Sequence, residues 1–203
     1  MSVSYYEENA QSYFDATVSA NVSELRARFL RHVRLGGRIL DAGCGAGRDL
    51  RAFADAGHDA IGFDASARLA VLAAAHSGRP VTVLRFEDMS YVKEFDGIWA
   101  CASLLHLARE ALPDVFGRCA RALRPGGAFY LSFKHGATTR IEGGRTFTDM
   151  TEPEARLALE AAGCSVVEVW ISRDVRPSRT ALWLNVIALR HISSESGLGH
   201  YGR

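Results

Sequence analysis

The sequence predicts an α/β fold built on a doubly wound, mostly parallel sheet, and three observations carry this prediction. Residues 36–50 read as an apolar strand, a glycine-rich turn and the start of a helix. Farther along, apolar runs alternate with segments of helical spacing, as in repeated strand–helix units. Residues 95–101 are apolar on both faces, which is typical of a buried parallel strand.

Residues 1–35 precede this core and are predicted to be helical. Asn21 and Glu24 are spaced as in a capping box at the start of an amphipathic helix, and Arg26 is expected to face solvent. The apolar face of this helix consists of Leu25, Phe29, Leu30 and Val33. Residues 2–20 carry aromatic rings among acids and amides, so they suit either a helix packed on the edge of the domain or a lid. These rings are Tyr5, Tyr6, Tyr13 and Phe14.

The glycine-rich turn has glycine at three alternate positions, Gly43, Gly45 and Gly47. Glycine has no Cβ and adopts positive φ, so backbone N–H groups and a helix N-terminus can come close to a ligand there. The next apolar strand, residues 60–63, ends at Asp64, where a carboxylate can accept two hydrogen bonds from a ribose diol. The turn and this acid together predict a site for a nucleoside cofactor.

A third strand is expected over residues 81–86, after a helix that Ser66 caps and that runs to His76. Glu87, Asp88 and Met89 follow this strand directly. Asp88 is placed to cap a short helix that follows, a role that is compatible with a ligand contact.

Residues 95–101 lead into a loop, 102–106, at the carboxyl end of the fourth strand, where chemistry is expected in an open α/β sheet. A helix then ends at a turn, 124–127, and the fifth strand covers residues 128–133. Residues 134–149 are polar and glycine-rich, and we expect them to form a loop.

The chain closes with a helix and a β-hairpin. Thr151 and Glu154 form a capping box for a helix that runs to Gly163. Residues 166–171 and 182–189 are β-rich runs joined by a charged loop. The domain plan is therefore an N-terminal lid or helical segment, a core and a tail that is expected to be disordered, over residues 1–35, 36–192 and 193–203.

These features resemble the class I S-adenosylmethionine-dependent methyltransferases over nearly the whole chain. The glycines run G-x-G-x-G, as in the first motif of that family, whereas a dinucleotide-binding turn would have its third glycine where Arg48 stands. The resemblance implies a Rossmann-like, seven-stranded sheet in the order 3-2-1-4-5-7-6 with one antiparallel strand. It also implies an enzyme that methylates a small molecule, because the chain has no inserted recognition domain.

The resemblance implies a set of cofactor-binding residues. They are Tyr13, Asp41, Gly43, Gly45, Arg48, Asp64, Ala65, Asp88, Met89, Cys101 and Ala102. Asp64 would hold the ribose, Asp88 the adenine amino group, and Tyr13 would lie nearest the methionine end. Arg48 could reach the methionine carboxylate or face solvent, and Asp41 is expected to brace the turn by accepting backbone N–H bonds.

A general base is needed only where the methyl acceptor must lose a proton. The candidates follow the fourth and fifth strands or belong to the N-terminal segment; they are His106, His135, Lys134 and the tyrosines. His106 and Tyr13 are the predicted catalytic residues, although His106 could instead pack between its leucine neighbours. Arg140 and Arg145 could clamp an anionic substrate or face solvent.

Two other functions match part of the sequence. Tyr130 and Lys134 have the Tyr-x-x-x-Lys spacing of short-chain dehydrogenases, which use NAD(P), but on a strand four steps separate the side chains by about 13 Å. A non-catalytic domain that binds or senses S-adenosylmethionine is the other alternative. No metal site is predicted, because the cysteines and histidines lack ligand spacing.

The composition narrows the partners further. The 203 residues suit one domain, and 24 Lys+Arg against 23 Asp+Glu give a formal net charge of +1. We therefore expect a small-molecule substrate and neither nucleic acid nor membrane as partner, in a monomer or homodimer. No C-x-x-C pair and no signal peptide is found, so reduced thiols and a cytoplasmic location are expected. The four cysteines are Cys44, Cys101, Cys119 and Cys164.

Overall fold

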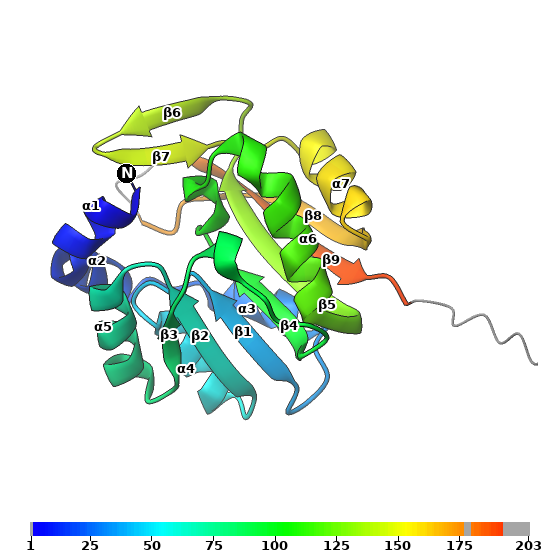
Figure 1. Ribbon diagram of the computed structural model, residues 1–203, viewed down its shortest axis with the longest axis horizontal. Helices are drawn as coiled ribbons and strands as arrows, with labels where there is room; N and C mark the ends of the chain where they lie inside the picture. The colour runs from blue at the N-terminus through cyan, green and yellow to red at the C-terminus, as the bar shows by residue number, and fades with distance from the viewer. Residues whose placement is uncertain (1, 177–179, 193–203) are drawn as a thin grey trace, which may run out of the picture.

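The computed structural model of the chain describes residues 2–176 and 180–192, and its centre is a seven-stranded sheet (Figure 1). The strands are β1 Arg38–Ala42, β2 Asp59–Asp64, β3 Val81–Val83, β4 Phe95–Ala100, β5 Leu123–Lys134, β8 Cys164–Arg173 and β9 Leu182–Arg190. Their order is β3-β2-β1-β4-β5-β9-β8. All neighbours are parallel except β9, which is antiparallel to β5 and β8. The predicted sheet, its order and its single antiparallel strand are confirmed.

Helices cover both faces of this sheet, as Figure 1 shows. The helices α6 Leu112–Ala122 and α7 Glu152–Ala161 pack on one face. The helices α3 Ser23–Leu30 and α4 Arg48–Asp55 pack on the other, where Phe29 and Phe53 contact Trp99 of β4. The helix α5 Ala67–Ser77 lies beside α4 and is capped by Ser66, as predicted, since the Leu69 N–H donates to its hydroxyl.

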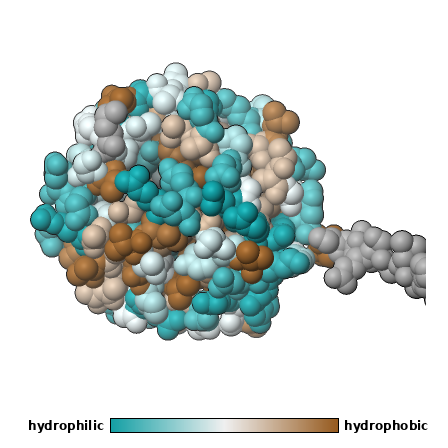
Figure 2. Space-filling model, viewed as in Figure 1, coloured by the Kyte–Doolittle hydropathy of each residue, from teal (hydrophilic) through white to brown (hydrophobic). Residues whose placement is uncertain are grey.

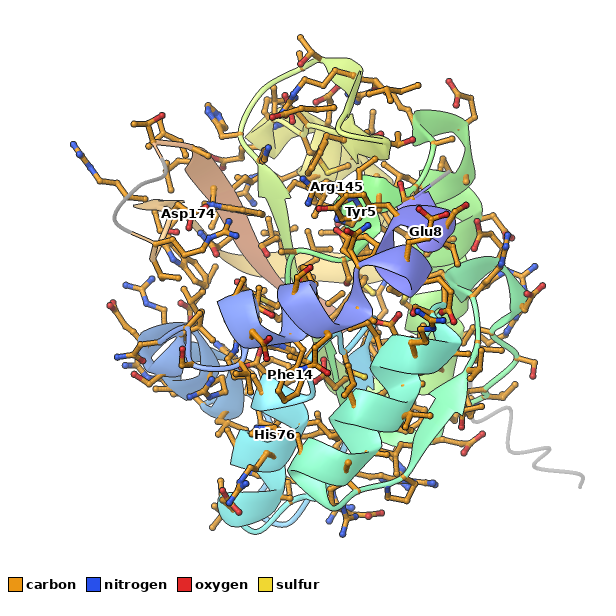
Figure 3. The ribbon with its side chains drawn as sticks, turned by 90° about the vertical axis from the view of Figure 1, so that its left-hand side faces the viewer. Tyr5, Glu8, Phe14, His76, Arg145 and Asp174 are labelled. Atoms are coloured by element: carbon orange, nitrogen blue, oxygen red, sulfur yellow. The ribbon has the colours of Figure 1, made fainter. Side chains whose placement is uncertain are left out.

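Two short helices, α1 Ser2–Glu8 and α2 Ala10–Thr17, lie at the carboxyl end of the sheet (Figures 1 and 3). The Ser66 hydroxyl donates a hydrogen bond of 2.6 Å to Glu7. The ring of Phe14 packs edge-on against His76 of α5, with 5.7 Å between the ring centroids, and Figure 3 shows both side chains in this contact. The N-terminal segment is therefore fixed to α5 by both polar and aromatic contacts.

The predicted capping box at Asn21 and Glu24 is wrong. The cap residue of α3 is Val22, and the Asn21 amide oxygen instead accepts a hydrogen bond from the Ser23 N–H at 3.0 Å. Arg26 does not face solvent either. It forms an ion pair with the buried Asp49 of α4 at 2.5 Å, a partner that no local pattern in the sequence reveals.

The region expected to be a loop, residues 134–149, contains a β-hairpin of β6 Thr139–Glu142 and β7 Arg145–Thr148. Gly143 and Gly144 form its tight turn, with φ values of +56° and +75°. Such a glycine pair is a hairpin signal, which the polar composition of the segment concealed. The hairpin lies beside α1 and above the carboxyl end of the sheet in Figure 1.

Two predicted strand boundaries also change. β3 ends at Val83 rather than Phe86, because a 3-10 helix, η1 Phe86–Asp88, begins there. Asp88 is the last residue of η1 and no helix begins directly after it in the described chain, so its predicted role as a helix N-cap is wrong. β5 begins at Leu123, and its pairing with β4 shifts between Phe95 and Gly97, which accommodates the predicted turn within the strand.

The surface in Figure 2 mixes hydrophilic and hydrophobic residues, and its largest hydrophobic area lies toward the sheet edge formed by β3. Val83 at this edge exposes 55% of its surface. Among the described residues, no helix is both long and apolar enough to cross a membrane. The tail predicted to be disordered, residues 193–203, lies outside the part of the chain that the structure describes.

Candidate active site

The glycine-rich turn after β1 requires glycine for two reasons. Gly43, Gly45 and Gly47 all have positive φ, between +54° and +72°. A Cβ on Gly43 would lie 2.6 Å from the Cβ of Ser103, and one on Gly47 would lie 2.8 Å from the backbone of Ala73. The turn is thus packed between the loop after β4 and helix α5, and Gly45 and Gly47 are buried there.

Asp64 joins the end of β2 to this turn. Its Oδ2 accepts a hydrogen bond from the Gly45 N–H and its Oδ1 accepts one from the Ser66 N–H, both at 2.9 Å. Burial raises the pKa of this carboxyl, and the N–H donors oppose that shift. A carboxylate has about four lone-pair directions, so two remain for further donors. That is the capacity which a ribose diol would use.

A cavity of about 240 Å³ opens at this point. Its wall includes Asp64, Gly43 and Gly45 of the glycine-rich turn, part of the N-terminal segment and the loop after β4. Of the predicted site residues, those that line it are Tyr13, Gly43, Gly45, Asp64, Ala65, Ala102 and His106. Segments far apart in the sequence therefore meet at one cavity, as expected from the carboxyl ends of β1, β2 and β4.

A second cavity, of about 130 Å³, lies next to the first. Two of the predicted residues, Arg48 and Cys101, line this one, together with residues of the β8–β9 connection. Tyr13 and Ala102 line both cavities. The Tyr13 ring lies against the glycine turn, 3.2 Å from the position that a Cβ on Gly45 would take. Tyr13 therefore separates the two cavities, and burial raises the pKa of its hydroxyl.

Arg48 is held by an ion pair rather than extended into solvent. Its Nη2 lies 2.6 Å from Asp49 Oδ2 and its Nε donates to Asp49 Oδ1 at 3.1 Å. Asp49 also accepts hydrogen bonds from Arg26 and from the Trp99 indole. Burial alone would raise the pKa of Asp49, but the two guanidinium groups hold it below its usual range. Asp49 was not among the predicted residues, because its partners lie on three separate elements.

Asp41 is buried and lines neither cavity. Its Oδ2 has no hydrogen-bond partner among the described residues. Burial and the nearby Asp49 raise the pKa of Asp41 well above the ordinary value, whereas the Leu50 N–H acts in the opposite direction. The backbone bonds expected to brace the turn are therefore incomplete, and the environment favours the neutral acid.

Asp88 and Met89 lie away from the cavity that the other residues form. Asp88 is exposed and outside the lining, and Met89 is fully buried in the core. The lining contains Arg85, Phe86 and Glu87 instead. β3 ends three residues earlier than predicted and η1 follows it, so the residues that line the cavity after this strand precede Asp88 in the sequence.

His106 lies in the first cavity in contact with Tyr6, one of the tyrosines named as candidate bases, whereas Tyr13 was the tyrosine predicted to be catalytic. The Tyr6 hydroxyl oxygen is 2.6 Å from His106 Nε2, and His106 Nδ1 is 2.8 Å from the Thr146 carbonyl oxygen. Because a carbonyl only accepts, we assign the ring proton to Nδ1, so Nε2 accepts from the tyrosine O–H. Burial lowers the pKa of His106 to about 4 and raises that of Tyr6 to about 12. Both groups are therefore neutral near pH 7, and the Nε2 lone pair accepts the tyrosine hydrogen bond.

The other candidate bases are placed less favourably. His135 is exposed and lines neither cavity. Lys134 is half-buried, and its Nζ lies 4.0 Å from the centroid of the Phe147 ring. All four cysteines are free thiols. In the described part of the chain, no group of three or more histidine, cysteine and acidic side chains could hold a metal ion.

Known proteins match this chain in sequence. Residues 39–127 match the family model of a methyltransferase domain. The ubiquinone biosynthesis O-methyltransferase of Methylococcus capsulatus is 32% identical over 120 residues, which are 55% of this chain and 50% of that protein. The cypemycin N-terminal methyltransferase of a Streptomyces species is 33% identical over 150 residues, which are 70% of this chain and 61% of that protein. The chain thus spans half the length of the first of these relatives.

The fold also matches solved structures. One is the crystal structure of the Burkholderia thailandensis 1,6-didemethyltoxoflavin-N1-methyltransferase with bound 1,6-didemethyltoxoflavin and S-adenosylhomocysteine. The TM-score is 0.78 at 23% sequence identity, and the match covers 93% of this chain and 87% of that one. The methyltransferase-domain match over residues 39–127, together with the shared fold and sheet order, supports a class I S-adenosylmethionine-dependent methyltransferase.

Proposed function

We propose that this protein transfers a methyl group from S-adenosylmethionine to a small-molecule acceptor. The observation that carries the proposal is the Asp64 carboxylate, which lines the first cavity and is fixed by the Gly45 and Ser66 N–H groups. When bound, the cofactor supplies a methyl group already activated on a sulfonium. The protein then has to bind it, align the acceptor, exclude water and accept any proton that is released.

The residues present fit the cofactor by their chemistry. Asp64 retains acceptor capacity for two hydroxyl groups, and the positive-φ glycines leave the backbone open to a polar ligand. Phe86 offers an aromatic wall on the side where the adenine would lie. Tyr13 covers the glycine turn and would shield the methionine end from water.

The Tyr6–His106 pair is suited to accept a proton from the acceptor. His106 Nε2 already accepts a hydrogen bond from the Tyr6 O–H, so when the tyrosine oxygen takes a proton from the acceptor, its own proton can pass to Nε2. The tyrosine then stays neutral and the histidine becomes an imidazolium. This assigns proton transfer to Tyr6 and His106 and the covering role to Tyr13. The names of the relatives refer to an oxygen in one protein and an amino terminus in the other, so they do not select the acceptor atom.

Titration calorimetry with S-adenosylmethionine, S-adenosylhomocysteine and NAD tests the cofactor assignment. We expect the two adenosyl compounds to bind and NAD not to bind. Asp64→Ala should weaken their binding by about tenfold or more, because it removes a charged acceptor. Asp55→Ala, which changes an exposed acid of α4, is the matched control. Preference for NAD, or wild-type affinity in Asp64→Ala, would refute the proposal.

A second measurement separates an enzyme from a binding domain. Pools of small hydroxyl, amine and thiol compounds are incubated with S-adenosylmethionine, and S-adenosylhomocysteine is measured by mass spectrometry. Formation of this product with one pool and not with the others supports catalysis. Tight cofactor binding without product in any pool would favour the non-catalytic domain instead.

A further inference from the structure

Two cationic side chains lie beside the Tyr6–His106 pair, on neighbouring elements. Lys134 ends β5, and its Nζ lies 4.0 Å from the Phe147 ring centroid. Arg145 begins β7, and its guanidinium carbon lies 5.0 Å from the same centroid and 4.5 Å from that of Tyr5. Figure 3 shows Arg145 and Tyr5 directed toward each other between the hairpin and α1. Both cations therefore flank one aromatic ring.

Neither cation is neutralised by a carboxylate. Within the described residues, no salt bridge includes Lys134 or Arg145, and the buried Nε of Arg145 has no hydrogen-bond partner. Arg140 on the same hairpin differs, because its Nη1 lies 2.6 Å from Asp149 Oδ2 and its Nε 3.8 Å from Glu142. Arg140 therefore anchors the hairpin, whereas Lys134 and Arg145 form no ion pair within the described residues, and Glu142 and Asp149 act on Lys134 only from a longer distance.

The positive charges of Lys134 and Arg145 act on His106, the proposed proton acceptor. The rings of His106 and Phe147 are 5.1 Å apart, and the Thr146 carbonyl, between Arg145 and Phe147 in sequence, accepts from His106. Burial has the largest effect on the pKa of His106 and lowers it, while the hydrogen bond to Thr146 raises it. The positive charges of Arg145 and Lys134 have smaller effects, and both lower this pKa. Arg145 also lies near the Tyr6 hydroxyl, where it opposes the effect of burial on the tyrosine pKa.

We propose that Arg145 and Lys134 bind an anionic group, a carboxylate or a phosphate, on the methyl acceptor. Partly buried cations without a counter-ion are costly, and aromatic faces compensate only part of that cost. A bound anion would supply the missing counter-charge to both side chains. The arginine guanidinium can donate to two of its oxygens, and the lysine ammonium adds a further donor. The acceptor would then be held at its anionic end with its nucleophile toward Tyr6 and His106.

This inference rests on the proposed function, because it concerns the methyl acceptor, but anion binding can be measured without methyl transfer. The protein saturated with S-adenosylhomocysteine is titrated with para-fluorobenzoate, para-fluorophenyl phosphate and para-fluorobenzamide, followed by fluorine NMR. We expect the anions to bind and the neutral amide to bind about tenfold more weakly or worse. The benzoate and the phosphate distinguish the two kinds of anionic group.

The variants Arg145→Met and Lys134→Met should each weaken binding of the preferred anion by about tenfold and leave the amide unchanged. Arg145→Lys keeps a charge on the hairpin and should give an intermediate loss. The matched control is Arg121→Met, an exposed arginine near the end of α6, which should behave as wild type. Thermal melts report whether each variant folds.

Equal binding of amide and anions, no binding of either anion, or unchanged anion binding in a variant that combines Arg145→Met and Lys134→Met would overturn the inference. If S-adenosylhomocysteine itself fails to bind to the wild type, the proposed function fails. The same NMR titration in its absence then still decides whether Arg145 and Lys134 form an anion site.

Discussion

The Tyr6 hydroxyl oxygen lies 2.6 Å from His106 Nε2, which joins the first helix of the chain to the loop after β4. The same helix is fixed at two more points, since Ser2 accepts from the Thr146 N–H and Glu7 accepts from the Ser66 hydroxyl. The N-terminal segment thus contacts the hairpin, the β4 loop and α5 together. The Tyr6–His106 hydrogen bond therefore joins the N-terminal helix that covers the cavity to the histidine proposed to accept a proton.

Tyr6→Phe should lower the rate of methyl transfer to an acceptor that must lose a proton, by about 100-fold. The ring remains, so α1 should keep its edge contacts with Tyr13 and His106, and cofactor affinity should stay near wild type. Product formation under saturating cofactor and calorimetry with S-adenosylhomocysteine check the two parts. Tyr91→Phe, near the opposite end of the sheet, is the control. A variant as fast as wild type would remove Tyr6 from the proton path.

His106 should make the protein less stable as the pH falls. Its folded-state pKa of about 4 lies below the ordinary 6.5, so between these values the unfolded chain binds more protons than the folded one. From neutral pH to about pH 5 this group should remove roughly 2 kcal/mol of stability. Urea unfolding at both pH values measures the loss.

His106→Gln cannot titrate, so its loss of stability over the same pH range should be smaller by about that amount. His135→Gln changes an exposed histidine and should leave the wild-type pH dependence intact. If His106→Gln and wild type lose stability equally, His106 is not buried in its neutral form.

The sheet was predictable because its signals are local. Residues 95–101, apolar on both faces, and the glycines after Asp41 report strand, turn and helix start without reference to the rest of the chain. The hairpin signal at Gly143 and Gly144 was equally local and was missed only because the flanking residues are polar. Local patterns also place Asp64 at a strand end, where it lines the cavity.

Contacts between distant segments were not predictable from local patterns. Tyr6 and His106 are separated by 100 positions, and Arg26 and Asp49 lie on different helices. No spacing rule in one sequence pairs such residues. Asp88 shows another limit. β3 ends three residues earlier than predicted, and Asp88 does not line the cavity. Site residues are thus only as predictable as the strand ends that carry them.

Alanine substitutions of Gly47 and Gly57, at the two ends of α4, can distinguish the cost of backbone strain from the cost of a steric clash. Both have positive φ, +72° and +86°, but a Cβ on Gly47 would meet the backbone of Ala73 at 2.8 Å, whereas one on Gly57 would meet nothing within 4 Å. Gly57→Ala should therefore cost only the strain, about 1–2 kcal/mol. Gly47→Ala should cost about 1–3 kcal/mol more, because α5 must move. Urea unfolding at neutral pH compares them directly. Equal losses would mean that α5 shifts without cost, and that the turn does not depend on close packing at Gly47.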